Sequence, residues 1–197
     1  KVARRLGRSL LELGGNNAAI VCKSADIDLT VKGITFAAAG TTGQRCTTLR
    51  RLFVHSDIHE VVLTKLKKAF KALKIGDPMD RSTQVGPLIS EQSFNQMQEK
   101  LVSCKSKGLA VTGGERIDHA KEVYVTPAIV ETNKHIEEMH EETFAPILYV
   151  MPFTDLKEAI SLQNSVRQGL SSSIFTNDVR ESEFFLGPEG SDCGIAN

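Results

Sequence analysis

The fold is decided by a stretch that opens with Ala18-Ala19-Ile20-Val21-Cys22 and closes with Arg50-Arg51-Leu52-Phe53-Val54-His55. Both runs are short and apolar at their centres, and branched or aromatic side chains of this kind favour buried strands. Between them, Asp26 or Asp28 can cap a helix that continues to Ala39. The stretch therefore predicts a strand, a helix and a second strand, the repeating unit of a parallel sheet covered by helices.

The same alternation continues along the rest of the chain. Apolar residues at helical spacing, preceded by capping residues, predict further helices that start near Asp57, Ser90, Asp155 and Asp178. Extended segments are expected at residues 9–13, 109–112, 123–130 (with a break or an edge at Pro127), 144–153, 171–176 and 193–196. We predict an α/β fold, with a mostly parallel sheet flanked by helices, in a single domain covering residues 1–197.

Composition excludes several classes of function. Apolar residues make up 41% of the 197 residues and charged residues 24%, which is ordinary for a globular protein. Lysine plus arginine number 24, as do aspartate plus glutamate, so the basic bias of a nucleic-acid-binding protein is missing. No apolar run approaches the roughly 20 residues that span a bilayer, and no secretory signal opens the chain. We expect neither a nucleic-acid partner nor a membrane.

The four cysteines are Cys22, Cys46, Cys104 and Cys193. They are widely spaced and form no CxxC pair, so we interpret them as free thiols in a reducing compartment, the cytoplasm or the mitochondrial matrix. No cluster of histidine and cysteine has metal-ligand spacing, and we predict no metal site. The first residue is not methionine and no polar tail closes the chain, so both ends look truncated.

Cys46 lies in the turn Gly43-Gln44-Arg45-Cys46-Thr47-Thr48, just past the expected helix end. A nucleophilic cysteine needs a cationic neighbour or an adjacent base, because the thiolate is the attacking species. Arg45 supplies a neighbouring charge, and the glycine and threonine neighbours keep bulk away from the sulfur. From these residues alone, a small buried cysteine is the more ordinary interpretation.

Glu12 is the second candidate, in the run Leu11-Glu12-Leu13-Gly14-Gly15-Asn16. A carboxylate among leucines is expensive to bury without a partner. Strand alternation would turn Glu12 to solvent, which is the ordinary interpretation. The functional interpretation is a general base, held in an apolar wall beside the glycine turn.

Together these two blocks resemble the paired active-site signature of the aldehyde dehydrogenase superfamily. A third block, Glu141-Glu142-Thr143-Phe144-Ala145-Pro146, resembles the acid-x-Phe-Gly-Pro segment of that family, with Ala145 at the usual glycine. The resemblance covers essentially the whole chain. Residues 7–10, 142–150 and 169–176 are most similar to the antiquitin-like branch of the superfamily.

The resemblance implies a role for each matching residue. Cys46 would attack an aldehyde carbon to give a thiohemiacetal and then a thioester, and its backbone amide would contact the oxyanion. Glu12 would activate the water that hydrolyses the thioester. Arg45 would pair with a carboxylate of the substrate. The expected substrate is a small-molecule aldehyde, in particular a semialdehyde such as α-aminoadipic semialdehyde.

The resemblance also implies a cofactor, NAD, with NADP as the alternative. Glu142 would bind the nicotinamide ribose, Phe144 would pack near the nicotinamide, and Gly14 would let the backbone approach the cofactor closely. From pattern alone, Glu142 belongs to a solvated acidic loop, Phe144 to the core and Arg45 to the surface.

The same resemblance implies that parts of the enzyme lie outside this chain. We expect a truncated catalytic domain without the cofactor-binding domain, inactive or weakly esterolytic alone, from an enzyme that forms homo-oligomers when whole. One alternative is a non-catalytic copy that acts only by associating with full-length subunits. Another is a cysteine thioesterase, which would need a histidine partner, although none of the five histidines, His119 among them, stands in a motif with Cys46.

Overall fold

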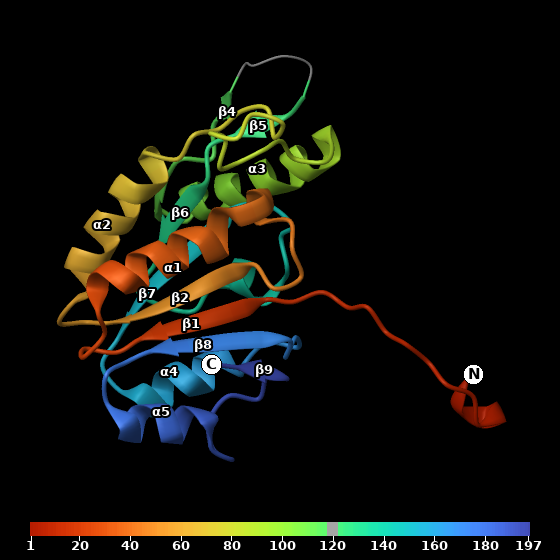
Figure 1. Ribbon diagram of the computed structural model, residues 1–197, viewed down its shortest axis with the longest axis vertical. Helices are drawn as coiled ribbons and strands as arrows, with labels where there is room; N and C mark the ends of the chain where they lie inside the picture. The colour runs from red at the N-terminus through yellow and green to blue at the C-terminus, as the bar shows by residue number, and fades with distance from the viewer. Residues whose placement is uncertain (118–121) are drawn as a thin grey trace.

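The computed structural model describes residues 1–117 and 122–197, so His119 lies outside the described residues. Within them, the main feature is a seven-stranded sheet in the order β3-β6-β7-β2-β1-β8-β9, covered by helices on both faces (Figure 1). Its strands are β1 (Asn17–Val21), β2 (Leu49–His55), β3 (Ala110–Thr112), β6 (Ala128–Glu131), β7 (Ile147–Phe153), β8 (Ser171–Phe175) and β9 (Ile195–Ala196). All neighbours are parallel except β3 and β6. The prediction of a mostly parallel sheet is confirmed.

Alternating side chains send the strands' apolar residues into two layers of core. On one face, α1 (Ile27–Ala39) and α2 (His59–Lys71) pack on the residues that include Ala19, Val21, Leu52 and Val54. On the other face, α4 (Leu156–Gln163) and α5 (Val179–Leu186) cover the side that holds Ile20 and Phe53. Further along that second face, α3 (Glu91–Ser106) covers β6 and β7. The remaining elements are the hairpin of β4 (Arg116–Ile117) and β5 (Tyr124–Val125) and three 3-10 turns, η1 (Ala3–Arg5), η2 (Gly40–Gly43) and η3 (Glu137–His140).

Four helices begin after the capping residues that the sequence predicts. Asp26, Ser90, Asp155 and Asp178 each accept a hydrogen bond from a backbone N–H in the first turn of the helix that follows. The predicted cap at Asp57 is wrong: α2 begins at His59, its N-cap position is Ile58 without a side-chain hydrogen bond, and Asp57 forms an ion pair with Lys23. Pro127 separates β5 from β6, as its missing N–H predicts. None of the helices in the described part of the chain is both long and apolar enough to cross a membrane.

The predicted strand at residues 9–13 is wrong. Residues 1–13 form an extended arm that leaves the body of the molecule (Figure 1), and Leu10, Leu11 and Leu13 are 83%, 71% and 70% exposed. The strands on either side of β1 begin only at Leu49 and Ser171. A continuation of β1 toward residue 9 would therefore run beside turns, with no strand edge to pair with. The apolar residues of this run cannot compensate for the missing hydrogen bonds.

A buried carboxylate ties the segment ahead of β7 to α3. The Glu138 side chain in η3 is 5% exposed and accepts hydrogen bonds from Ser103 Oγ and Lys107 Nζ at the end of α3. Burial opposes ionisation of Glu138, but these hydrogen bonds outweigh it and lower the pKa of the carboxyl to about 2. A carboxylate with a lowered pKa stabilises the fold above its unfolded pKa and loses that contribution as the pH falls.

We therefore expect Glu138→Gln to lower the free energy of unfolding at pH 7 by about 1–3 kcal/mol, because the charged hydrogen bonds are lost. The difference from wild type should shrink as the pH falls from the ordinary value of 4.5 toward 2. Urea unfolding at several pH values measures it. Glu137→Gln, at the exposed neighbouring position, is the control, with an expected change within about 0.5 kcal/mol. A difference that stayed constant with pH would contradict the prediction.

Candidate active site

The three blocks singled out in the sequence meet because each precedes one of three adjacent parallel strands. Gly14 to Asn16 lead into β1, the Cys46 turn leads into β2, and Glu142 to Phe144 lead into β7. These strands lie side by side in the order β7-β2-β1 and all run the same way. Their amino ends therefore share one edge of the sheet, and segments that are far apart in the chain become neighbours.

At that edge lies an open cavity of about 670 Å³. Its walls contain all six predicted site residues together with Leu13, Gln44 and Thr47; the six are Glu12, Gly14, Arg45, Cys46, Glu142 and Phe144. In the described part of the chain no histidine lines this cavity. The described residues therefore place no histidine base beside Cys46 of the kind that the thioesterase hypothesis requires.

The turn that carries Cys46 follows a stretch of unusual backbone conformation. Thr41, Thr42 and Gly43 follow one another in left-handed conformation, with φ of 53°, 56° and 68°. Branched side chains rarely adopt this region, so the two threonines store strain. Two hydrogen bonds offset it: Thr42 Oγ1 donates to Gly86 O at 2.9 Å, and Thr41 Oγ1 accepts from Arg45 Nε at 2.7 Å.

Gly43 also allows close contact between two blocks of the site. A side chain there would lie 2.5 Å from the backbone of Ala145 and of Pro146. No other residue type both fits that space and adopts the positive φ freely. Gly43 therefore lets the nucleophile turn pack directly on the segment that carries Glu142.

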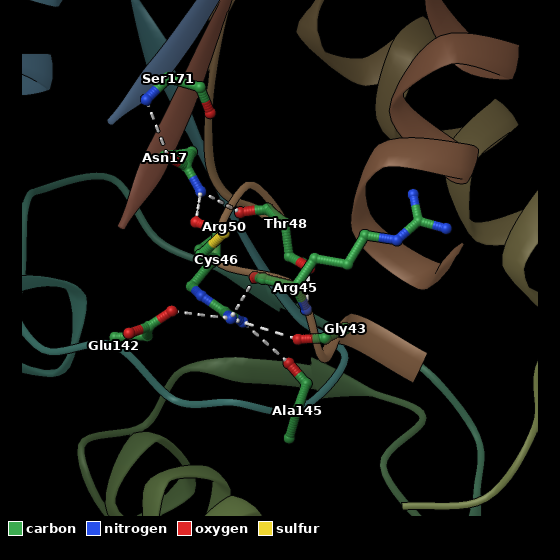
Figure 2. A network of polar contacts seen from close by, with 9 residues as sticks. All are labelled: Asn17, Gly43, Arg45, Cys46, Thr48, Arg50, Glu142, Ala145 and Ser171. Atoms are coloured by element: carbon green, nitrogen blue, oxygen red, sulfur yellow. Dashed lines mark hydrogen bonds and ion pairs between the residues drawn. The ribbon is translucent and has the colours of Figure 1, made fainter. Parts of the chain in front are cut away.

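Asn17, which the sequence did not single out, holds the Cys46 turn against the sheet (Figure 2). Its Nδ2 donates to the carbonyl oxygens of Cys46 and Thr48, both at 2.8 Å, and its Oδ1 accepts from Ser171 N at 3.1 Å. The Cys46 side chain is exposed to the cavity. In the described residues no group accepts a hydrogen bond from the Cys46 amide, which is the proposed oxyanion donor.

Arg50 is the second residue that sequence reasoning missed. Its side chain is 2% exposed, and its guanidinium donates to Ala145 O, Gly43 O, Arg45 O and Glu142 Oε1 (Figure 2). Burial lowers the pKa of Arg50, and Glu142 opposes that shift. The available signal was the pair Arg50-Arg51 at the start of an apolar strand, since a buried charge has to find partners.

Glu142 and Phe144 do not lie where the sequence pattern alone would place them, in a solvated loop and in the core. The Glu142 carboxylate is 18% exposed and forms an ion pair with Arg50 at 3.3 Å, so it is no freely solvated loop charge. Its Oε2 lies against Gly14, where a side chain would come within 2.0 Å. Phe144 is 41% exposed rather than core, and the Arg50 guanidinium lies 5.6 Å from its ring centroid.

Arg45 and Glu12 line the cavity with fewer contacts. The exposed Arg45 side chain extends toward α1, away from the Cys46 sulfur (Figure 2), with its guanidinium 5.3 Å from the ring centroid of Phe36. Glu12 is exposed on the arm. The prediction that Glu12 is held in an apolar wall is wrong, because the Leu11 and Leu13 side chains are mostly exposed. Across the described residues, no three histidine, cysteine or acidic side chains are arranged to hold a metal ion.

Comparison with known proteins places this site in a family. The aldehyde dehydrogenase family model matches residues 1–192. The chain is 48% identical over 198 residues to alpha-aminoadipic semialdehyde dehydrogenase of Mus musculus and 47% identical over 196 residues to aldehyde dehydrogenase family 7 member A1 of Pisum sativum. Both alignments cover all of this chain, which spans 36% and 39% of the length of these relatives.

Solved structures agree with this assignment. Lactaldehyde dehydrogenase from Escherichia coli is 32% identical with a TM-score of 0.91, covering 98% of this chain and 41% of that one. Betaine aldehyde dehydrogenase from Staphylococcus aureus, solved in complex with NAD+, is 26% identical with a TM-score of 0.90, covering 98% of this chain and 39% of that one.

Gly43→Ala should lower the free energy of unfolding by about 3 kcal/mol or more, because it adds a backbone clash to an unfavourable φ. Gly108→Ala is the matched control: Gly108 also has a positive φ, of 77°, but a side chain there would meet nothing within 4 Å. Because the positive φ alone is unfavourable for alanine, Gly108→Ala should lower the free energy of unfolding by about 1–2 kcal/mol. Urea unfolding compares the two, and equal losses would show that the contact with Ala145 and Pro146 is unimportant.

Iodoacetamide should alkylate Cys46 first in the native protein, roughly tenfold or more ahead of Cys22 and Cys104. Those two thiols are 1% and 0% exposed, and burial raises the pKa of each. Peptide mass spectrometry over a time course measures the order, and urea provides the control in which the four cysteines should label alike. Labelling of Cys46 no faster than that of the two buried thiols would contradict an accessible nucleophile.

Proposed function

The chain belongs to the aldehyde dehydrogenase family, and from this premise we propose that residues 1–197 are the nucleophile-bearing catalytic domain of an enzyme that oxidises an aldehyde to the carboxylic acid. The observation that supports the proposal is the single cavity at the amino ends of β1, β2 and β7. There Cys46, Glu12, Glu142 and Phe144 come from three separate segments.

In the proposed first step, the Cys46 thiolate attacks the aldehyde carbon, a C–S bond forms, and the carbonyl oxygen becomes an oxyanion. The backbone N–H of Cys46 faces this charge as a donor. Donors of this kind are worth roughly 3–4 kcal/mol each in comparable sites. Asn17 supports the step by holding the Cys46 carbonyl, and with it the turn, against the sheet.

The residues present fit a nicotinamide dinucleotide. Gly14 has no side chain and so makes room for Glu142 Oε2, and no hydrogen bond from the described residues engages that oxygen, so it can accept from ribose hydroxyls. Phe144 offers an exposed aromatic face in the same cavity. NAD+, or NADP+ as the alternative, supplies the acceptor for the hydride that the aldehyde carbon loses. The cofactor-binding domain itself is proposed to lie outside this chain.

In the last step, Glu12 takes a proton from water as the water attacks the thioester carbon, and the Cys46 thiolate leaves. The exposed position of Glu12 on the arm implies that the arm must pack closer to Cys46 for this step. Acylation of Cys46 and hydrolysis through Glu12 need no hydride acceptor. We therefore propose that the chain alone retains weak esterase chemistry.

The proposed substrate is an aldehyde that carries a carboxylate, a semialdehyde such as α-aminoadipic semialdehyde. Arg45 lines the cavity, and the planar fork of a guanidinium suits a carboxylate. The Arg45 guanidinium lies against Phe36, so the side chain has to turn toward Cys46 to bind such a substrate. The name of the Mus musculus relative supports the same class of substrate. The whole protein is proposed to form homo-oligomers in the cytoplasm or the mitochondrial matrix.

Ester turnover tests the two catalytic assignments. With p-nitrophenyl acetate, Cys46→Ala should abolish turnover, whereas Glu12→Gln should slow it roughly 10²-fold or more and let an acetyl group accumulate on Cys46. Nitrophenolate release measures the rate, and peptide mass spectrometry locates the acetyl group. Cys193→Ala, outside the cavity, is the control and should behave as wild type. Equal rates for wild type and Cys46→Ala would reject the nucleophile and leave a non-catalytic copy as the better hypothesis.

A further inference from the structure

Two buried arginines begin β2 side by side, and their side chains bind different parts of the molecule. Arg50 and Arg51 are 2% and 1% exposed. Arg51 donates to the carbonyl oxygens of Asn16, Leu162 and Gln163, and so ties the start of β1 to the end of α4. Arg50 has no part in those contacts. The pair provides a natural comparison between a buried arginine in a supporting layer and one at the candidate site.

Arg50 bridges two of the three blocks that form the cavity. Its Nη2 donates to Gly43 O at 3.2 Å and to Arg45 O at 3.4 Å, within the nucleophile turn. Its Nη1 donates to Ala145 O at 3.2 Å, and Nη2 also reaches Glu142 Oε1 at 3.3 Å, both in the block ahead of β7. A lysine could not reach these four oxygens together, because it lacks the planar fork of a guanidinium.

One of these contacts acts on the peptide that the chemistry needs. Arg45 O and the N–H of Cys46 belong to the same peptide unit, and that unit is planar. A donor that fixes the carbonyl oxygen therefore also fixes the direction of the N–H, which is the proposed oxyanion donor. Arg50 shares this carbonyl with the N–H of Thr48, which donates to it at 3.1 Å. A charged donor on the carbonyl also polarises the peptide and strengthens the hydrogen bond that its N–H can give.

The contact with Arg50 gives the two oxygens of the Glu142 carboxylate different roles. Oε1 is engaged by Arg50, so Oε2, which lies against Gly14, is the oxygen left for a ligand. Burying a guanidinium is expensive, and it is retained here with its Nη atoms bound across both blocks. An apolar residue could fill the same volume but could not orient a carboxylate and a peptide together.

We infer that Arg50 is a positioning residue that sets the Cys46 amide and the Glu142 carboxylate at the same time, and so couples the oxyanion site to the cofactor site. The inference rests on the proposed function for the roles of Cys46 and Glu142. Arg50 itself is not among the residues that line the cavity. Its loss should affect acylation and cofactor binding together, although the two involve different segments of the chain.

The experiment compares Arg50→Met with Arg51→Met in the intact protein that contains this chain. Each variant removes one buried guanidinium from adjacent positions of β2. Amide hydrogen exchange followed by mass spectrometry reports how firmly Arg50 holds the Cys46 turn and the block ahead of β7, and it needs no enzyme activity. Arg50→Met should speed exchange in peptides that span residues 43–48 and 142–146, whereas Arg51→Met should speed it around residues 15–17 and 162–164.

Kinetics measure the coupling. Arg50→Met should raise the KM for NAD roughly tenfold and lower the rate of ester turnover, which needs no NAD, by a similar factor. Arg51→Met should change the KM for NAD less than twofold at a temperature where both variants are folded. Arg50→Lys keeps the charge and should recover part of both losses, and it is measured in the same way should Arg50→Met fail to fold.

Two results would overturn the inference: the same exchange pattern in both methionine variants, or an Arg50→Met enzyme with normal KM for NAD and normal ester turnover. Failure of the proposed function looks different. In that case wild type and Cys46→Ala would have equal activity, while the exchange experiment would still show whether Arg50 orders the two segments.

Discussion

Parallel pairing of β1, β2 and β7 is the constraint on which the candidate site depends. Because the three strands are neighbours and run the same way, the residues before each of them converge at one edge of the sheet. Ligands of open parallel sheets more often bind at the carboxyl ends of strands, where the loops that enter helices lie. Here the segments that enter strands carry the candidate site residues, so side chains near the cavity are positioned by strand register.

Strand pairing brings the three segments to one edge of the sheet but does not fix their conformations. Buried polar contacts hold them in place relative to one another. Asn17 joins the Cys46 turn to β1 and β8 through three backbone contacts. Arg50 joins the same turn to the block ahead of β7. Because the interior has a low dielectric constant, such bonds are costly to break. Thr41 and Thr42 keep their strained left-handed conformations through other bonds, from Arg45 Nε to Thr41 Oγ1 and from Thr42 Oγ1 to Gly86 O.

The arm shows where this arrangement is incomplete. Glu12 lies on an exposed arm, and in the described part of the chain the leucines around it find no core to pack on. A general base needs a defined distance to its water, so an exposed arm is a weak support for one. The candidate site therefore holds Cys46, the proposed nucleophile, firmly and Glu12, the proposed base, loosely.

The sequence by itself determined the α/β class, the helix starts at four capping residues, and, through motifs that resemble those of a known family, the six candidate residues that share the cavity. Those predictions rest on local properties: spacing of apolar residues, side-chain caps, and motifs read in order along the chain. Only the tertiary structure decided that residues 9–13 are no strand, that Phe144 is exposed, and that Arg50 and Asn17 support the site. The physical reason is that strand pairing and the partners of buried charges depend on segments distant in sequence, which no local pattern of residues records.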